Sequence, residues 1–302
     1  MTPDISSQLH GNLEFREAAL PVLRSDTALL FVHGMGHQAN SYDQAMNHFS
    51  AEEGMRCLSI SLEGHGGSPL NHTRSSINEL SIADYNASIR DALEFLAAHS
   101  SRVVIVCHSL SGRCGYELAY DRSLPEQVKG VVLLAPVPAQ GTAVSALNTT
   151  FMDMVRSGRL TPLSFPYALL VTRDIETFLK SDPDRAMSIF FSDDRGASSH
   201  LSGVPPQEFM NRYLCGESTR ALYQIMLPSW QRAHFNAPPV LIIGAQDDRI
   251  ILPGALRRMR YSIARADGQV SLSMLDGVSH DIPMDVGQHA AWETISHWMR
   301  SI

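Results

Sequence analysis

The chain has few cysteines, and none is spaced like a metal or redox motif. The four cysteines among its 302 residues are Cys57, Cys107, Cys114 and Cys215, and no two of them form a C-x-x-C pair. Three of the four lie in or beside apolar segments, where a free thiol behaves as a small hydrophobic side chain. The sequence therefore predicts a reduced, intracellular protein without a disulfide framework or a cysteine-based metal site.

The chain also lacks an excess of positive charge and long apolar runs. It carries 24 Lys and Arg against 31 Asp and Glu, and the net charge of −7 argues against a nucleic acid partner. No segment is apolar over the length that crosses a bilayer, so no transmembrane segment is expected. Residues 1–15 show no basic region followed by an apolar one, as a signal peptide would. These features predict a soluble, cytoplasmic protein, and the charge does not indicate its substrate.

The composition that is present belongs to an ordinary globular protein, with 44% hydrophobic and 18% charged residues. Short apolar runs rich in β-branched residues alternate with helix-like patterns. This alternation predicts an α/β fold with a mostly parallel sheet covered by helices on both faces. Residues 14–23 suggest an additional antiparallel hairpin at the start. The expected strands are 28–32, 55–61, 102–107, 128–135, 239–244 and 270–275, and the expected helices are 42–53, 82–98, 112–121, 254–264 and 287–300.

The alternation stops between residues 138 and 235. This segment has no clear strand, but it has helical patterns at 205–221 and 222–232, and it holds five of the chain's 13 methionines. The simplest interpretation is a helical cap at 138–235 inserted into a core formed by 1–137 and 236–302. Its Met and Phe residues fit either an apolar substrate or ordinary packing within the cap.

A candidate nucleophile lies where an expected strand runs directly into an expected helix. A nucleophile at such a turn has a strained backbone, so the residues two before and two after it must be small, usually in the pattern G-x-S-x-G. Here Ser109 is flanked by Cys107 and Ser111, so both glycines are missing. Cysteine and serine are among the next smallest side chains, and Ser109 is therefore predicted to be the nucleophile. The alternative is a serine that only caps the following helix.

Two later loops supply an acid and a base in the chain order Ser, Asp, His. Asp247 and Asp248 follow the strand that ends at Gly244, and His280 follows the last strand and the turn at Gly277. A serine hydroxyl needs a base to take its proton, and the base needs an acid to fix its tautomer. We expect His280 to be the base, with one of the two aspartates as its acid and the other as a turn or capping residue.

Backbone donors for an oxyanion are expected in the loop after the first parallel strand and at the strand-to-helix turn around Ser109, hereafter the elbow. His33 and Gly34 turn the chain so that the Met35 N–H can point into the site, and Leu110 supplies the second N–H at the start of a helix. His33 and His37 have the spacing of metal ligands, but no third ligand is suitably spaced. We interpret them as loop residues and expect neither a metal nor a cofactor.

Five motifs in this order resemble the α/β-hydrolase-fold family with a helical cap, and they cover nearly the whole chain. In that family the acid is usually followed by a polar residue and two apolar residues, which favours Asp248 over Asp247. The chain departs from the family pattern at the elbow and at Ser61, where many members have Asp. The motifs are HG-x-G at 33–36, G-H-G-x-S at 64–68, V-x-H-S-x-S-G at 106–112, G-x-x-D-D-R-I at 244–250 and G-x-x-H-D at 277–281.

The resemblance implies a cofactor-independent serine esterase or lipase that forms an acyl-enzyme on Ser109. Its substrate would be a partly apolar carboxylic ester or thioester. Family members that are dehalogenases or epoxide hydrolases have Asp at the nucleophile position, so Ser109 argues against these activities. The alternatives are a biosynthetic acyltransferase or thioesterase, a C–C bond hydrolase, in which Asn often stands where this chain has His108, and a ligand-binding receptor on the same scaffold.

Overall fold

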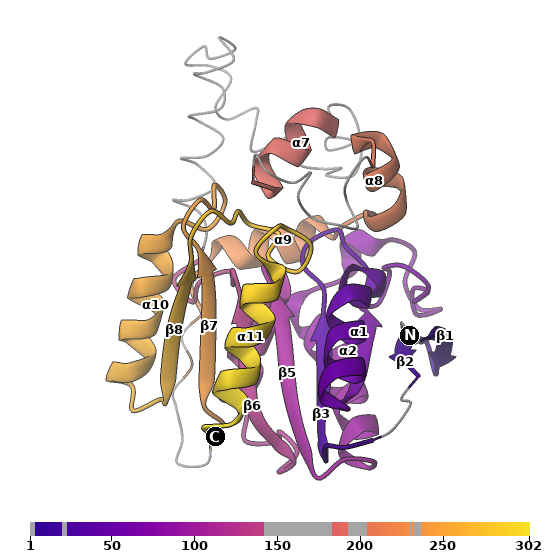
Figure 1. Ribbon diagram of the computed structural model, residues 1–302. Helices are drawn as coiled ribbons and strands as arrows, with labels where there is room; N and C mark the ends of the chain where they lie inside the picture. Colours follow the sequence, from indigo (N-terminus) through magenta and orange to yellow (C-terminus); the bar gives the residue numbers. More distant parts are fainter. Residues whose placement is uncertain (1–3, 20–22, 142–182, 193–203, 230, 232–236) are drawn as a thin grey trace.

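The computed structural model describes residues 4–19, 23–141, 183–192, 204–229, 231 and 237–302, and its centre is an eight-stranded sheet (Figure 1). The strand order is β1-β2-β4-β3-β5-β6-β7-β8. Strands β3 to β8 pair in parallel, and β1 and β2 form an antiparallel hairpin on β4. The strands are β1 Ile5–His10, β2 Leu13–Ala18, β3 Thr27–Val32, β4 Arg56–Ser61, β5 Arg102–His108, β6 Val128–Leu134, β7 Val240–Ala245 and β8 Val270–Leu275.

Helices cover both faces of this sheet, as the sequence predicts. One core cluster packs α2, α3 and α10 on residues such as Leu30 and Ile105, and the other packs α1 and α11 on residues such as Leu29 and Val104. Neighbouring residues of one strand serve opposite faces because side chains alternate along a strand. The helices are α1 Asp43–Glu53, α2 Ile82–Ala97, α3 Leu110–Ala119, α7 Pro183–Phe190, α8 Pro206–Tyr213, α9 Thr219–Met226, α10 Pro253–Arg265 and α11 Gln288–Met299, with short 3₁₀ turns η1 Ala39–Tyr42 and η2 Ile77–Glu79.

The predicted α/β fold is confirmed, and the six expected parallel strands and five core helices begin and end within two residues of their predicted bounds. The hairpin is the first difference, because it spans residues 5–18 rather than 14–23 and turns at Gly11. Strand β1 lies at the edge of the sheet and is mostly exposed, so it has no apolar alternation to mark it.

The second difference concerns the predicted helix at 205–221, which is two helices, α8 and α9, separated by residues 214–218. Ser218 caps α9 by accepting the Ala221 N–H. Cys215 donates its backbone N–H to the carbonyl of Gly36 at 2.7 Å. The segment is thus extended because its backbone forms hydrogen bonds with a loop of the core instead of helical hydrogen bonds within the segment.

The predicted cap lies largely outside the described residues, which include 138–141, 183–192, 204–229 and 231 of the segment 138–235. Helices α7 and α8 lie beyond one end of the sheet and pack together with Met284 (Figure 1). The cap and its boundaries stay a prediction. In the described ranges no helix is both long and apolar enough to cross a bilayer.

Candidate active site

Ser109 lies at a sharp turn between β5 and α3. Its backbone angles are φ 52° and ψ −110°, a conformation that costs energy for any residue with a Cβ. Hydrogen bonds hold it there: its N–H donates to the Leu134 carbonyl at 2.9 Å, and its own carbonyl accepts the N–H groups of Gly112 and Val137. This geometry places the Ser109 side chain at the carboxyl end of the parallel sheet, where α/β folds bind their ligands.

Ser111 stands at one of the missing glycines and has a structural role there. Its hydroxyl lies 2.9 Å from the Val32 carbonyl oxygen and 3.0 Å from the His108 carbonyl oxygen, and it accepts the His108 N–H at 3.0 Å. Ser111 is fully buried. The serine therefore ties the end of β3 to the elbow, which a glycine could not do.

Cys107 stands at the other missing glycine and packs against Gly115 of α3, where a Cβ would lie 3.0 Å from the Cys107 sulfur. Gly112, the residue after Ser111, packs against Pro136, and a Cβ there would lie 2.6 Å from the Pro136 Cβ. The elbow thus has its glycines one and four residues after Ser111.

The three side chains predicted as nucleophile, base and acid are joined by two short hydrogen bonds. Ser109 Oγ lies 2.8 Å from His280 Nε2, and His280 Nδ1 lies 2.8 Å from Asp248 Oδ2. All three residues are buried, with exposed fractions of 7%, 2% and 3% for Ser109, His280 and Asp248. With Nδ1–H donating to the carboxylate, Nε2 is left to accept the serine proton.

Asp248 rather than Asp247 faces His280. Its second carboxylate oxygen accepts the N–H groups of Ile250 at 2.7 Å and Ile251 at 2.8 Å. Asp247 is exposed, and its backbone N–H donates to the Val278 carbonyl. The turn therefore fixes the Asp248 carboxylate in one orientation, and Asp247 contributes its backbone to the loop.

His108 is hydrogen-bonded to the backbone of His280. Its Nε2 lies 3.0 Å from the His280 carbonyl oxygen, so the ring donates a hydrogen bond to the base's own backbone. Burial lowers the pKa of His108 well below its ordinary value, and the nearby His280 lowers it further. A neutral His108 holds His280 in place without adding a positive charge beside it.

The loop 33–37, hereafter the oxyanion loop, lies against the elbow. A Cβ on Gly34 would be 2.7 Å from His108 Nδ1 and 3.1 Å from the Ser109 Cβ, so glycine permits this close approach. The Gly34 carbonyl oxygen accepts the His37 N–H at 3.2 Å and a hydrogen bond from His33 Nδ1 at 2.8 Å. Because a trans peptide points its C=O and N–H in opposite directions, the Met35 N–H points away from these two donors.

The Leu110 N–H is the second predicted donor. Leu110 is the first residue of α3, so its N–H has no acceptor within the helix and lies at the positive end of the helix dipole. It directly follows Ser109 in the chain. Both predicted donors thus belong to peptides next to the Ser109 side chain.

His33 and His37 are bound within the protein, as expected for loop residues. His33 Nε2 accepts the Leu62 N–H at 3.0 Å while its Nδ1 serves the Gly34 carbonyl. His37 lies 3.5 Å from a carboxylate oxygen of Asp281 and 3.3 Å from the Ser41 hydroxyl. Across the described part of the chain, no group of three His, Cys, Asp or Glu residues is arranged to hold a metal ion.

Two buried aspartates near His280 are missed by the sequence analysis. Asp285 accepts hydrogen bonds from the backbone of Ser279 at 2.9 Å and from the hydroxyl of Ser192 at 2.8 Å, and so joins the His280 loop to the end of α7. Asp281 has no hydrogen-bond partner for its carboxylate among the described residues, and burial raises its pKa to about 7. Asp285 lies outside the family motifs, and Asp281 is the last residue of the G-x-x-H-D motif, which does not indicate that its carboxylate is buried.

The departure at Ser61 is compensated by Glu14 of the neighbouring strand β2. One oxygen of the Glu14 carboxylate accepts the Ser61 hydroxyl at 2.6 Å and the Gly67 N–H at 2.8 Å. Burial alone would raise the pKa of Glu14, but these hydrogen bonds lower it. A carboxylate from a different strand therefore holds the loop 64–68.

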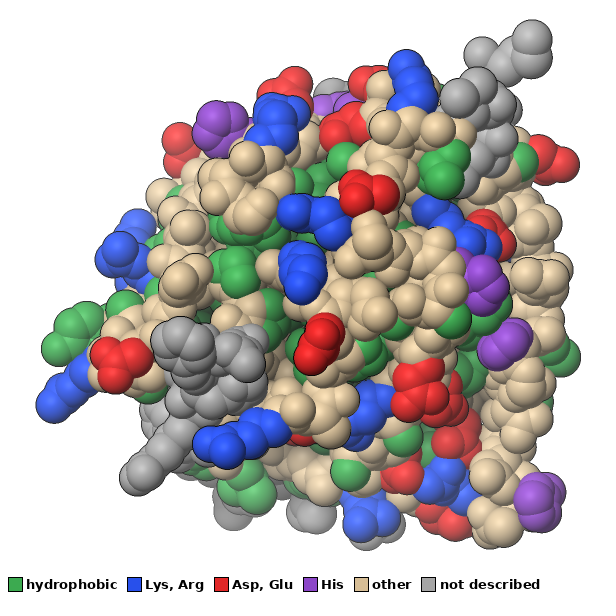
Figure 2. Space-filling view, turned by 90° about the horizontal axis from the view of Figure 1, so that it is seen from below, with side chains coloured by type: hydrophobic (Ala, Val, Ile, Leu, Met, Phe, Trp, Pro, Cys, Tyr) green, Lys and Arg blue, Asp and Glu red, His purple; other side chains and the backbone are tan. Residues whose placement is uncertain are grey.

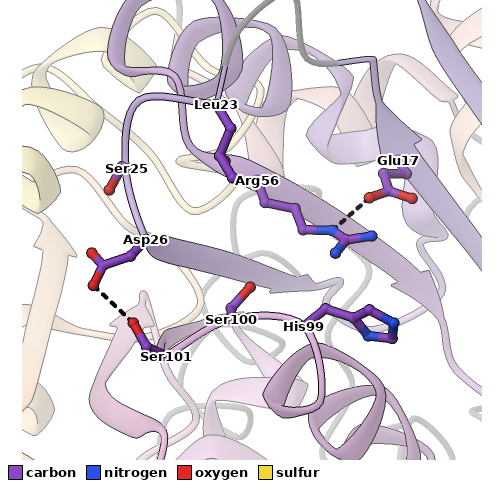
Figure 3. Close-up of a pocket in the computed structure, with 8 residues that line it drawn as sticks. All are labelled: Glu17, Leu23, Ser25, Asp26, Arg56, His99, Ser100 and Ser101. Atoms are coloured by element: carbon purple, nitrogen blue, oxygen red, sulfur yellow. Dashed lines mark hydrogen bonds and ion pairs between the residues drawn. The ribbon is translucent and has the colours of Figure 1, made fainter.

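A pocket of about 280 Å³ lies at the opposite, amino end of the parallel strands (Figure 3). Its polar groups bind one another: Arg56 pairs with Glu17 at 2.7 Å, and Ser101 donates to Asp26 at 2.7 Å. Figure 2, which views the molecule from that end, shows charges of both signs interspersed. The histidine of this pocket, His99, is hydrogen-bonded through Nδ1 to the Phe95 carbonyl oxygen at 2.7 Å, and Ser101 is hydrogen-bonded to Asp26 directly.

Comparisons with known proteins agree with this architecture. A similar solved structure is an esterase from Thermogutta terrifontis, with 14% identity and a TM-score of 0.61 over 98% of this chain and 97% of that one. Another is a soluble variant of monoglyceride lipase from Saccharomyces cerevisiae, with 15% identity and a TM-score of 0.62 over 100% and 97%. A thioesterase domain from the curacin biosynthetic pathway has 16% identity and a TM-score of 0.57 over 96% and 98%. At these identities the likeness shows a shared fold.

The family model described as "Alpha/beta hydrolase family" matches residues 29–292, from within β3 to within α11. The match includes the oxyanion loop, the elbow and the loops that carry Asp248 and His280. The chain belongs to the alpha/beta hydrolase family.

Proposed function

We propose that the protein is a serine hydrolase that cleaves a carboxylic ester or thioester of a partly apolar small molecule through an acyl-enzyme on Ser109. The observation that carries this proposal is the buried chain of two 2.8 Å hydrogen bonds from Asp248 through His280 to Ser109. It begins at a carboxylate fixed by two N–H groups and ends at a residue with a strained backbone. This is the arrangement that activates a serine hydroxyl.

In the first step the Ser109 oxygen forms a bond to the substrate carbonyl carbon, and its proton moves to His280 Nε2. The carbonyl oxygen takes up the negative charge, and the Met35 and Leu110 N–H groups stabilise it. Asp248 stabilises the imidazolium that forms. The bond to the leaving group then breaks, and His280 donates its proton to the departing alcohol or thiol.

In the second step water attacks the acyl group on Ser109 while His280 takes one of its protons. The ester bond to Ser109 breaks, the serine regains its proton, and the carboxylic acid leaves. Each proton transfer uses the same imidazole nitrogen, which lies within hydrogen-bond distance of the serine oxygen. The mechanism needs no metal or organic cofactor.

The experiment that tests the proposal is labelling with a fluorophosphonate together with hydrolysis of p-nitrophenyl esters and thioesters of increasing chain length. We expect wild type to be labelled and to turn over, and Ser109→Ala to lose the label and on the order of 10⁶-fold in kcat. Ser262→Ala, on the outer helix α10, is the matched serine control and should behave as wild type. Full activity of Ser109→Ala would contradict the proposal.

The same panel separates the alternative functions. An acyltransferase would pass the acyl group to an added alcohol or thiol faster than to water. A receptor-like protein would show ligand-induced stabilisation with no turnover by wild type.

A further inference from the structure

Glu217 is a buried carboxylate in the extended segment 214–218 between α8 and α9. Its side chain is 1% exposed. One oxygen accepts the Tyr85 hydroxyl at 2.6 Å and the Ser218 N–H at 2.7 Å, and the other accepts the Gly36 N–H at 3.0 Å. A buried charge is tolerated only when it is paired and hydrogen-bonded, so this carboxylate is held firmly in one place.

The partner that balances its charge is His65. His65 Nδ1 lies 3.0 Å from the Glu63 carbonyl oxygen, and Nε2 lies 3.4 Å from Glu217. Nδ1 is within hydrogen-bond distance of a carbonyl oxygen, whereas Nε2 faces the carboxylate as an ion pair without good hydrogen-bond geometry. Burial alone would lower the pKa of His65, but Glu217 raises it. Burial likewise would raise the pKa of Glu217, but His65 and the hydrogen bonds lower it.

The segment 214–218 also binds the oxyanion loop through its backbone. Cys215 donates its N–H to the Gly36 carbonyl at 2.7 Å, so residues 215–217 bind both the N–H and the C=O of Gly36. Gly36 has a φ of +64°, and a Cβ there would lie 3.3 Å from the Cys215 carbonyl oxygen. Side chains just beyond the loop, Gln38 and Asn40, donate to the Arg212 carbonyl and extend this contact.

The Gly36 N–H belongs to the peptide that follows the proposed oxyanion donor. On one side of Met35, the Gly34 carbonyl is fixed by His37 and His33. On the other side, the Gly36 N–H is fixed by the Glu217 carboxylate. The two peptides that flank the Met35 Cα are therefore both anchored, and only one of the anchors comes from outside the oxyanion loop.

We propose that Glu217 is a positioning residue for oxyanion stabilisation, which aligns the Met35 N–H by holding the Gly36 N–H. The inference rests on the proposed function, since it concerns the same reaction. A preorganised donor contributes to catalysis only when it stays aimed at the position of the developing charge. A displacement of about 1 Å is enough to reduce the rate by about 10²-fold.

A purely structural role for Glu217 makes a different prediction, because loss of folded protein reduces the amount of active sites and leaves the properties of each site unchanged. Misaligned donors instead lower kcat per active site and weaken tetrahedral adducts, while substrate binding changes little. The affinity for an alkyl trifluoromethyl ketone reports on this, since the ketone forms an oxyanion when Ser109 adds to it. The corresponding secondary alcohol cannot form the adduct and reports on ordinary binding.

The test measures Glu217→Ala and Glu217→Gln with the p-nitrophenyl ester that wild type hydrolyses best, with active sites counted by fluorophosphonate labelling. We expect kcat to fall by about 10²-fold for Glu217→Ala, in line with the loss of one oxyanion donor. Glu217→Gln keeps one acceptor oxygen and should lose about tenfold on the same scale. KM and the affinity for the alcohol should stay within about threefold, and the ketone affinity should fall with kcat.

Two further variants make the result specific. Tyr85→Phe removes an equally buried bond to the same carboxylate but leaves the Gly36 bond, so it should lower kcat less than Glu217→Gln does. Glu208→Gln, an exposed glutamate of α8, should match wild type.

Wild-type kcat and ketone affinity per active site in Glu217→Ala would overturn the inference, as would a loss confined to KM. If Glu217→Ala does not fold, wild-type kcat and ketone affinity per active site in Glu217→Gln would overturn the inference instead. A wild-type protein without Ser109-dependent hydrolysis would overturn the proposed function, and this inference with it.

Discussion

The molecule contains two buried carboxylate–histidine pairs that look alike but hold their protons differently. In the pair Asp248–His280 one ring nitrogen donates to the carboxylate and the other meets a hydroxyl, which can donate. In the pair Glu217–His65 one ring nitrogen faces the carboxylate and the other faces a carbonyl, which can only accept. The first imidazole therefore has a nitrogen that can accept the serine proton, whereas Glu217 raises the pKa of the second and favours its charged form. In each pair one ring nitrogen faces the carboxylate. The group next to the other ring nitrogen, a hydroxyl or a carbonyl, decides whether the pair suits proton transfer or structural support.

Among changes to the two pairs, the largest loss of activity is expected when the acid of the first pair, Asp248, is replaced. Asp248→Asn should reduce kcat by about 10⁴-fold, because the amide can stabilise the wrong tautomer of His280 and cannot balance the imidazolium. Asp247→Asn is the matched control and should stay within about twofold, since Asp247 is exposed and only its backbone is bound within the loop. Steady-state kinetics on one ester measures both. A larger loss from Asp247→Asn would reverse the assignment.

Removing the histidine of the second pair should reduce stability. His65→Ala leaves the Glu217 carboxylate buried without a counter-charge, which costs about 3–5 kcal/mol of the free energy of unfolding. His280→Ala removes one hydrogen bond to Asp248 rather than a favoured counter-charge, so its cost should be smaller by at least about half. Urea denaturation followed by circular dichroism measures both free energies. Equal losses in the two variants would show that the pairs do not differ in charge.

Asp281 offers a third carboxylate for the comparison, one whose histidine neighbour, His37, lies 3.5 Å away. Burial raises its pKa to about 7, and Asp285 adds to this effect while His280 opposes it. An acid with a folded-state pKa above its unfolded value loses stability as pH rises between the two values, here from about 4 to about 7. Asp281→Asn should therefore be more stable than wild type at pH 8, by up to about 4 kcal/mol.

Thermal unfolding of both proteins from pH 4 to pH 8 measures this difference. At pH 4, where Asp281 is protonated, the two proteins should have nearly equal melting temperatures. A difference that does not change with pH would contradict the interpretation of Asp281 as a buried acid without a strong partner.

The smallest expected effect is the pH dependence of the second pair. The raised pKa of His65 makes its contribution complete below about pH 6.5, and this contribution is lost as pH rises through the folded-state value. The lowered pKa of Glu217 makes its contribution complete above about pH 4.5, with loss toward lower pH. The stabilisation by the pair should thus be greatest between about pH 4.5 and 6.5. The Tm difference between wild type and His65→Gln, about 2–4 °C per kcal/mol, follows this window.

The sequence predicts much of the fold because the core elements leave strong local patterns. Parallel strands that are covered on both faces, such as β5 and β7, are continuous apolar runs, and core helices such as α2 and α11 have an apolar, buried face. The edge strand β1 has no such pattern because most of it is exposed. The break at 214–218 follows from contacts with Gly36, which no local pattern contains, although Gly216 is a residue that disfavours a helix.

The residues of the candidate site also fall into those that the sequence predicts and those that it does not. Ser109, Asp248 and His280 can be predicted because each directly follows a strand, and parallel strands bring their carboxyl ends to one edge of the sheet. The structure brings these three together, and it also shows Asp248 rather than Asp247 at His280. Glu217 and His65 are 152 positions apart in the chain. Their pairing depends on how the segment 214–218 packs, so residue type and spacing do not indicate it.

Ser111 has a consequence for the way this site responds to temperature. Its hydroxyl joins the last residue of β3, Val32, to the backbone of His108, and the oxyanion loop begins one residue after Val32. The elbow and the oxyanion loop are thus cross-linked by one small side chain. We expect this link to restrain their relative position when either segment moves with temperature. A pattern search that demands glycine here would overlook a chain that uses the position for rigidity.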